Sequence, residues 1–242
     1  MVKHLLPLVP GPLKCYVEPF AGGASLFFAL PAKPAYSVLN DTRDDLINYY
    51  RIVQTRAAEL EMLLRATLHS ESEWNRAKSL SDDRHADPLQ RAWATHTKIM
   101  QSFATKGDCW ARHNSAHRFS GHFRADAAKR LAEYVEISCE DAIACIHRRD
   151  HEHAFFYVDP PYPGADRPSA WDRWDQTDWE RLIETLDGIA GSYLLSGYPN
   201  AVTPRDCEFF SVTRSSTASR GAAKPVTECL WRRLNRHHQS LL

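Results

Sequence analysis

The sequence predicts an α/β fold, and three observations support that prediction. Short apolar runs, rich in aromatic and β-branched residues, alternate with longer segments that have apolar residues at helical spacing. A Gly-Gly turn follows the first of these runs, as at the start of nucleotide-type α/β units. Two more strand-like runs near the end of the chain flank a polar stretch, which is typical of an antiparallel hairpin. The 242 residues suffice for one sizeable α/β domain and a smaller subdomain.

The first α/β unit is expected to begin at Cys15. The segment CYVEPFAGGASLFFAL predicts a short strand, a Pro and Gly-Gly turn, and then the start of an apolar helix. The segment AYSVLND predicts a second strand that ends on Asp41. Residues 42–68 follow with apolar side chains at largely helical spacing, so we expect them to be helical.

Residues 68–130 differ in character from the rest of the chain. They are polar, rich in His and Arg, and lack the alternation of strands. Residues 91–130 hold eight Lys and Arg against two Asp, a local charge of +6 in a chain whose formal net charge is zero. The aromatic residues among these charges are Phe103, Trp110, Phe119 and Phe123. Such a stretch suits phosphate contacts and base stacking, and it equally suits a solvated helical insert whose aromatics pack onto the main domain.

After residue 130 the α/β pattern resumes. The segment YVEISCEDA predicts a strand that ends near Asp141, while AFFYVDPPY and SYLLSGY predict two buried strands. The segment TDWERLIETLDGIAG predicts a helix opened by a capping box between Thr177 and Glu180. The segments CEFFSVTR and VTECLWRRL predict terminal strands around a long hairpin loop, SSTASRGAAKP. From Arg205 onward, seven Lys and Arg exceed three acidic residues.

Composition bears on location and metal binding. The chain contains no apolar run of membrane-spanning length, no secretory signal pattern and no C-x-x-C pair among its six cysteines. We therefore expect a cytoplasmic protein with reduced thiols and no membrane association. Four potential metal ligands match none of the standard spacings of structural zinc sites, so we expect no metal. They are Cys109, His113, His117 and His122.

The run FFYVDPPY is the most specific indication of chemistry. Phe155 to Val158 suit a buried strand, which Pro160 and Pro161 end because neither can donate a backbone hydrogen bond. Asp159 and Tyr162 then lie on a stiff turn at the carboxyl end of a strand, where open α/β sheets bind ligands. An exocyclic amine on a heteroaromatic ring is a poor nucleophile because its lone pair is delocalised. The Asp159 carboxylate and Pro160 carbonyl would accept hydrogen bonds from such an amine, and Tyr162 would stack on its ring.

The Gly-Gly turn and Asp41 indicate a second ligand. Ala21, Gly22 and Gly23 are small enough for a ligand to approach the backbone closely. Asp41, at the end of the next strand, is placed either to accept hydrogen bonds from a ribose diol or to cap the following helix. The two features together suggest a ligand that carries a nucleoside and leave its identity open.

Three segments then resemble a known family. In this order, EPFAGGASLFF, VLNDTRDDLINYY and VDPPY look like the alpha arrangement of the D12-class DNA adenine-N6 methyltransferases. The resemblance implies a Rossmann-like S-adenosylmethionine-dependent methyltransferase sheet with a terminal antiparallel hairpin. It further implies a catalytic domain of residues 1–67 and 131–242 and a small, mainly helical target-recognition insert at 68–130. The implied reaction is direct attack of a flipped-out adenine N6 on the sulfonium methyl, without a metal.

The resemblance also assigns residues and partners. The cofactor-binding residues would be Phe20, Ala21, Gly22, Asp41, Asp141 and Asp159. The catalytic residues would be Asp159, Pro160, Pro161 and Tyr162. The basic regions would contact DNA through Lys106, Arg112, Arg118, Arg124 and Arg220. We expect double-stranded DNA as the partner of a monomer, with a restriction endonuclease as a second partner if the enzyme serves restriction-modification.

Two departures from the family and several alternatives bear on this interpretation. The chain opens at MVKHLLPLVPG, where family members carry a Lys and Gly-rich cofactor segment upstream, so we expect reduced cofactor affinity. The insert lacks the longer aromatic and Asn-containing recognition sequence, so the target sequence does not transfer. The alternative substrates are cytosine N4, an RNA adenine and a glutamine amide. The alternative that is not an enzyme is a catalytically inactive relic that still binds DNA.

Overall fold

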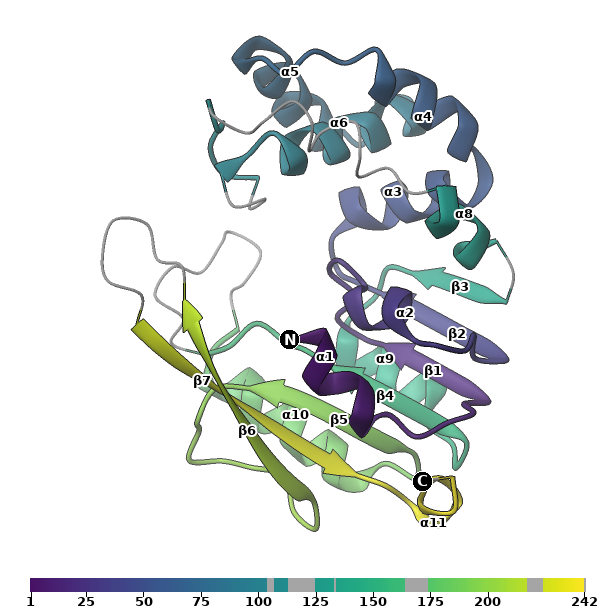
Figure 1. The fold of residues 1–242 in the computed structure, drawn as a ribbon, viewed down its shortest axis with the longest axis vertical. Coiled ribbons are helices and arrows are strands. Elements are labelled where there is room, and N and C mark those ends of the chain that lie inside the picture. Colours follow the sequence, from purple (N-terminus) through teal and green to yellow (C-terminus); the bar gives the residue numbers. More distant parts are fainter. Residues whose placement is uncertain (104–106, 113–124, 133, 164–173, 217–223, 242) are drawn as a thin grey trace. The chain divides into compact units, whose positions relative to one another are not determined.

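The computed structural model describes residues 1–103, 107–112, 125–132, 134–163, 174–216 and 224–241. The chain forms two compact units. One comprises Met1–Thr42 and Glu140–Leu242, and we call it the sheet unit; the other, Arg43–Cys139, is the helical unit. Figure 1 shows strands gathered in the first and helices in the second. The expected recognition insert, residues 68–130, lies within the helical unit, and its role stays a prediction.

Seven strands form one mostly parallel sheet in the order β3-β2-β1-β4-β5-β7-β6 (Figure 1). The strands are β1 (Cys15–Glu18), β2 (Tyr36–Asn40), β3 (Val135–Ser138), β4 (Ala154–Val158), β5 (Ser192–Gly197), β6 (Glu208–Ser216) and β7 (Lys224–Arg233). Strand β1 runs parallel to β2 and β4, and β4 runs parallel to β5. Strand β7 pairs antiparallel with both β5 and β6. The expected Rossmann-like sheet with a terminal antiparallel hairpin is therefore confirmed.

Apolar side chains cover both faces of the parallel strands. The helices of the sheet unit are α1 (Val2–Leu5), the 3₁₀ helix η1 (Leu6–Leu8), α2 (Ser25–Ala29), α9 (Ala142–Arg149), α10 (Gln176–Gly188) and α11 (Arg236–Gln239). Val17 and Phe156 join a core cluster with Trp179 of α10, while the neighbouring Tyr16 ring stacks against Phe27 of α2 and against Phe155. Because successive side chains of a strand point to opposite faces, burial on both faces explains the uninterrupted apolar run before Asp159.

Two boundaries in the sheet unit correct the sequence-based expectations. The capping box of α10 does not involve Thr177 and Glu180; Asp175 accepts from the backbone of Asp178 at 3.0 Å, and Asp178 accepts from the Asp175 amide at 3.2 Å. Aspartate caps a helix as well as threonine does, so the box forms two residues earlier. The terminal hairpin also extends into its expected loop, since β6 and β7 stay paired as far as Ser216 and Lys224.

The helical unit contains five described helices and β3. The helices are α3 (Asp44–Thr55), α4 (Ala57–Arg65), α5 (Glu71–Ser81), α6 (Pro88–Met100) and α8 (Ala125–Leu131). The helical stretch expected over residues 42–68 is two helices, because Arg56 has a non-helical φ of −136° between them. Helices α5 and α6 begin at good N-caps, since Ser70 accepts from the Glu73 amide and Asp87 precedes Pro88.

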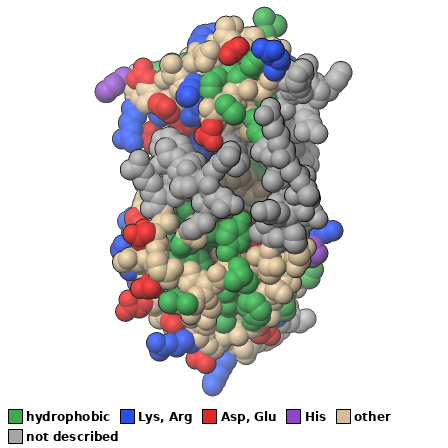
Figure 2. Space-filling view, turned by 90° about the vertical axis from the view of Figure 1, so that its left-hand side faces the viewer, with side chains coloured by type: hydrophobic (Ala, Val, Ile, Leu, Met, Phe, Trp, Pro, Cys, Tyr) green, Lys and Arg blue, Asp and Glu red, His purple; other side chains and the backbone are tan. Residues whose placement is uncertain are grey.

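The terminal strands of the sheet unit carry one area of exposed apolar surface. Figure 2 shows hydrophobic side chains gathered below the grey residues on one face of the molecule. In the sheet unit, Phe209 is 59% exposed and rests against Trp231, with the ring centroids 5.9 Å apart. A groove of about 410 Å³ includes both rings and the buried thiol of Cys229. None of the described helices is both long enough and apolar enough to cross a bilayer.

Candidate active site

The parallel register of the sheet unit brings the carboxyl ends of four strands to one edge. Glu18 of β1 pairs with Leu39 of β2, and Val158 of β4 pairs with Leu195 of β5. The segments that follow these strands begin at Pro19, Asp41, Asp159 and Tyr198. Residues predicted from three separate sequence segments therefore lie along the edge where α/β sheets bind ligands.

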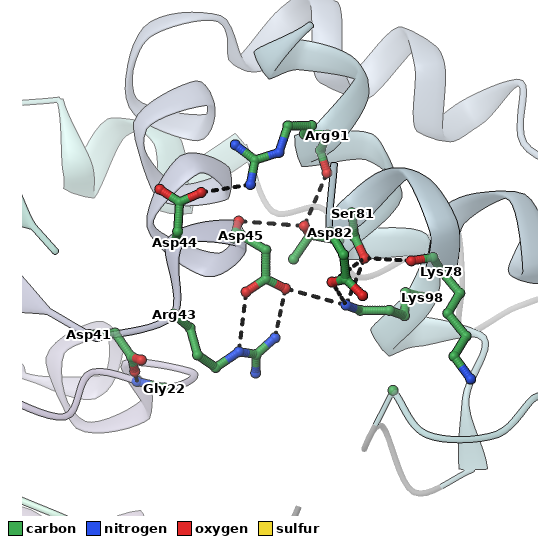
Figure 3. Close-up of polar contacts among 12 residues, drawn as sticks. Gly22, Asp41, Arg43, Asp44, Asp45, Lys78, Ser81, Asp82, Arg91 and Lys98 are labelled. Carbon is green, nitrogen blue, oxygen red and sulfur yellow. Dashed lines mark hydrogen bonds and ion pairs between the residues drawn. The ribbon is translucent and has the colours of Figure 1, made fainter. Parts of the chain in front are cut away.

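The turn after β1 exposes its backbone at Gly22. This residue has a φ of +46°, a left-handed conformation that favours glycine, and a Cβ built there would meet no atom within 4 Å. The Gly22 amide donates to Asp41 Oδ2 at 2.9 Å (Figure 3), and the Ala21 amide donates to the Asn40 carbonyl at 2.7 Å. Asp41 thus joins the turn, while the N-cap position of α3, the alternative role considered for Asp41, belongs to Arg43; the ribose contact stays a prediction.

Asn40 organises the same edge, and the sequence analysis did not single it out. Its side chain is fully buried and donates to the carbonyls of Pro19 and Glu140, both at 3.0 Å. Its Oδ1 accepts from the Glu140 amide at 3.0 Å. One amide group therefore fixes the turn after β1 against the segment that leads to Asp141. An amide residue at the end of a buried strand, directly before Asp41, is the signal that could have revealed it.

Glu18 lies buried at the end of β1. Its Oε1 accepts from the Tyr16 hydroxyl at 2.6 Å and from the Phe27 amide at 2.9 Å. Burial raises the pKa of the carboxyl to about 8, with the nearby Asp159 charge adding a smaller contribution in the same direction. At neutral pH Glu18 is therefore a neutral acid that ties β1 to α2.

The carboxylate of Asp159 is exposed at the end of β4 and is held by hydroxyl groups. Oδ1 accepts from Ser196 at 2.6 Å and from Tyr162 at 2.7 Å, while Oδ2 lies 3.4 Å from the Tyr157 hydroxyl. Burial first, and the Asp159 charge second, raise the pKa of both phenols. Both tyrosines therefore stay protonated and act as donors toward the carboxylate.

The ring of Tyr162, whose hydroxyl donates to this carboxylate, lies against a second aromatic ring. The rings of Tyr162 and Tyr198 are 4.5 Å apart and tilted by 58°. Pro160, between Asp159 and Tyr162, is buried, which fixes the turn. Ser196 and Tyr198 come from β5 and the residues just after it, and the sequence analysis assigned neither of them a role. The edge thus combines an exposed acid, a rigid turn and a pair of aromatic rings.

Comparison with known proteins agrees with this arrangement. The family described as "D12 class N6 adenine-specific DNA methyltransferase" matches residues 1–211. The chain belongs to this family. It is also similar to a protein of Lactococcus lactis subsp. cremoris named "Type II methyltransferase M1.LlaDCHI". The two are 24% identical over 258 residues, which cover 95% of this chain and 90% of the relative. The resemblance stated from the sequence is confirmed, and the chain is a DNA methyltransferase whose substrate is DNA.

Within this methyltransferase, two predicted cofactor residues have structural partners. The ring of Phe20 packs edge-on against Trp174, with the centroids 5.0 Å apart. Asp141 is the N-cap of α9, and its Oδ1 accepts from the Ala144 amide at 3.0 Å. The strand expected to end near Asp141 ends earlier, at Ser138. Their contacts with a cofactor stay predictions.

Of the predicted DNA-contacting residues, only Arg112 is within the described part of the chain, where it is exposed. The others lie outside the described residues; they are Lys106, Arg118, Arg124 and Arg220. The backbone next to Arg112 is anchored, because the Ala111 amide donates to the Gln101 carbonyl at 2.9 Å. The histidines considered for zinc, His113, His117 and His122, also lie outside the described residues.

The helical unit of the methyltransferase holds a separate polar cluster (Figure 3). Asp45 accepts from Arg43 at 2.9 Å and lies 3.4 Å from the Lys98 ammonium group. Lys98 also donates to Ser81 at 2.7 Å and lies 3.3 Å from Asp82. Nearby, Arg91 and Asp44 form an ion pair of 2.7 Å. The side chains of Asp45 and Lys98 are 4% and 7% exposed, so this cluster ties α3, α5 and α6 together in the interior.

Proposed function

We propose that the chain transfers a methyl group from S-adenosylmethionine to N6 of an adenine flipped out of double-stranded DNA. The observation that supports this most directly is the exposed Asp159 carboxylate, held by hydroxyl donors on the rigid turn at the carboxyl edge of the sheet. The family to which the chain belongs is described as N6 adenine-specific, which favours adenine over cytosine N4, an RNA adenine or a glutamine amide.

The residues of the β1 turn fit the proposed cofactor. The open space at Gly22 leaves room for a ligand beside the backbone, and the Asp41 carboxylate lies directly next to it. We propose that Phe20, Ala21 and Gly22 line the methionine part, that Asp41 holds the ribose and that Asp141 lies near the adenine ring. When bound, S-adenosylmethionine would supply a methyl group made electrophilic by its sulfonium; the sulfur would keep the electrons of the broken S–C bond and leave as S-adenosylhomocysteine, while N6 would lose one proton to water.

The chain's own groups would prepare the target amine. We propose that Asp159 and the Pro160 carbonyl each accept a hydrogen bond from N6, which favours a geometry in which the nitrogen lone pair leaves the ring system. Oδ2 of Asp159 is the better placed oxygen, because Oδ1 already accepts two short hydrogen bonds. The protonated phenol of Tyr162 donates to the carboxylate and does not take a proton from N6. The rings of Tyr162 and Tyr198 would flank the heterocycle.

The wider role follows from the relative. We propose that the enzyme acts in the cytoplasm as a monomer and belongs to a Type II restriction-modification system, in which a restriction endonuclease reads the same site. The name of the lactococcal relative supports the Type II assignment. We further propose that residues 68–130 recognise the target, with Arg112 and the other basic residues of the two basic regions on DNA phosphates.

The test is methyl transfer from labelled S-adenosylmethionine to unmethylated DNA, with the product digested to nucleosides and identified by mass. Asp159→Ala is compared with Glu184→Ala, a matched loss of an exposed carboxylate on α10. We expect N6-methyladenine from the wild type and from Glu184→Ala, and a rate at least about 100-fold lower from Asp159→Ala. Retained activity in Asp159→Ala would refute the catalytic role of Asp159. A product of 4-methylcytosine would refute adenine N6 as the methylated atom.

A further inference from the structure

We propose that Ser196 is a positioning residue for methyl transfer, whose hydroxyl fixes the orientation of the Asp159 carboxylate. The inference rests on the proposed function, because it assigns Ser196 an effect through a carboxylate that meets the target amine. Nothing in the sequence run SYLLSGY distinguishes this serine from an ordinary buried strand residue. The contact across two strands is what assigns the role.

The geometry places the hydroxyl directly on the carboxylate. Ser196 Oγ donates to Asp159 Oδ1 at 2.6 Å, a short bond of the kind that a hydroxyl makes to an ionised acceptor. The Val158 carbonyl is also near, but at 3.4 Å, so the carboxylate is the closer of these two acceptors. The pairing of Val158 with Leu195 sets the two residues beside each other across the β4–β5 pair.

The two ends of this contact differ in burial. Asp159 is exposed, and the terminal torsion of an aspartate is broad, so its carboxylate plane is not fixed by packing. Ser196 is 1% exposed and belongs to a strand paired on both sides, with β4 and with β7. A rigid donor that binds Oδ1 therefore limits rotation of the exposed carboxylate and leaves Oδ2, which lies 3.4 Å from the Tyr157 hydroxyl, as the oxygen available to the amine.

Orientation of this carboxylate bears on rate more than on binding. The amine must meet the carboxylate and the Pro160 carbonyl together, and small errors in placement of reacting groups reduce rates strongly. Tyr162 donates to the same oxygen at 2.7 Å, but its ring is also expected to contact the substrate. Ser196, buried beneath the turn, supports Asp159 without being placed to contact the base itself.

The chain offers a matched control in Ser192. It lies on the same strand and the same face, is fully buried and also makes a hydrogen bond through its hydroxyl, but to His238 Nδ1 at 2.8 Å. Ser192→Ala removes a comparable buried interaction at the opposite end of β5. A loss of rate caused only by weakened packing of the strand would follow from either substitution.

The experiment compares the wild type, Ser196→Ala, Ser196→Thr and Ser192→Ala in steady-state methyl transfer to DNA. For Ser196→Ala we expect kcat to fall roughly 10- to 100-fold while the KM values for DNA and S-adenosylmethionine change by about twofold or less. Ser196→Thr, which keeps the hydroxyl, should recover most of the rate. Ser192→Ala should lower the melting temperature with little effect on kcat.

A thermal double-mutant cycle of Ser196→Ala and Asp159→Ala checks the contact without any activity. We expect the two shifts in melting temperature to be non-additive, since both substitutions remove one shared hydrogen bond. Additive shifts, or an unchanged kcat in Ser196→Ala, would overturn the proposal and leave the proposed function intact. A wild type that produces no N6-methyladenine would refute the proposed function and the positioning role together, even with non-additive shifts.

Discussion

The sheet unit and the helical unit hold acidic side chains in opposite ways. One short run, VLNDTRDD, supplies residues to both. Asp41 joins the Gly22 backbone at the sheet edge, whereas Asp45, four residues later, is buried between Arg43 and Lys98 (Figure 3). Burial opposes the ionisation of Asp45, but the hydrogen bond and charge of Arg43, together with the Lys98 charge, outweigh it and lower its pKa.

Asp159 shows the other arrangement in its clearest form. Its described short contacts are with neutral hydroxyls, and the carboxylate itself is exposed. An acid held by cations in the interior has its charge compensated within the protein, and its oxygens serve the fold. An acid held by neutral donors at the surface keeps a lone pair available for a ligand. The groups that bind a carboxylate therefore indicate whether it stabilises the fold or is available for chemistry.

The largest expected effect comes from removing the buried acid, Asp45. Asp45→Ala leaves Arg43 and the buried Lys98 without their shared partner, so the free energy of unfolding should fall by about 3–5 kcal/mol. Urea unfolding would measure the loss. Asp82→Ala is the control, since its side chain is 57% exposed and contacts the same ammonium group; its effect should be about 1 kcal/mol or less. Equal losses from both would contradict the distinction.

Glu18 and Asp45 should also differ in how their contributions to stability depend on pH. Its folded pKa of about 8 lies above the ordinary value of 4.5, so the folded state keeps a proton that the unfolded state releases. Its contribution to stability is therefore complete below about pH 4.5 and lost as the pH rises toward 8, by an amount on the order of a few kcal/mol. Asp45, with a lowered pKa, has the opposite sign and loses its contribution as acid protonates it.

Unfolding by urea at several pH values between 5 and 8.5 would test the Glu18 assignment. Glu18→Gln keeps a neutral side chain of the same shape, so the variant should lose less stability than the wild type as the pH rises. Parallel curves for the two proteins would show that Glu18 ionises normally in the fold.

A smaller effect is expected at the cofactor edge. Asp41→Ala removes the acceptor of the Gly22 amide and the proposed ribose contact, so S-adenosylmethionine should bind roughly 10- to 100-fold more weakly. Isothermal calorimetry would measure the affinity. Asp44→Ala, three residues along the same run, removes an ion pair with Arg91 and should leave cofactor affinity unchanged. The opposite ranking of the two variants would argue against a cofactor site at the β1 turn.

The smallest expected effect is that of a single surface cation. Arg112→Ala should weaken DNA binding by about 1 kcal/mol and reduce the salt dependence of the association constant by about one unit of slope, as expected for one lost phosphate contact. Fluorescence anisotropy across a salt series would provide both values. Arg181→Ala on α10, another exposed arginine, is the control. An unchanged slope in Arg112→Ala would exclude Arg112 from the DNA interface.

Much of the fold and of the candidate site could be predicted from the sequence. Periodicity located the described strands of the sheet to within a few residues, and the turns at Gly22 and Asp159 were placed correctly. The errors were local: the capping box began at Asp175 because aspartate competes with threonine as an N-cap, and Arg56 divided one expected helix into two. The first depends on which side chain caps the helix and the second on the backbone conformation of one residue, and apolar spacing encodes neither.

The fold class, the family resemblance and the residues at the ends of β1, β2 and β4 could all be predicted from the amino-acid sequence, because each of these depends on local runs of residues. Only the tertiary structure revealed the partners of those residues. Asn40 fixes the segment before Asp141 from 100 residues away, and Ser196 reaches Asp159 across a strand pair. Hydrogen bonds between distant segments depend on strand register and burial, and these exist only after the sheet has formed.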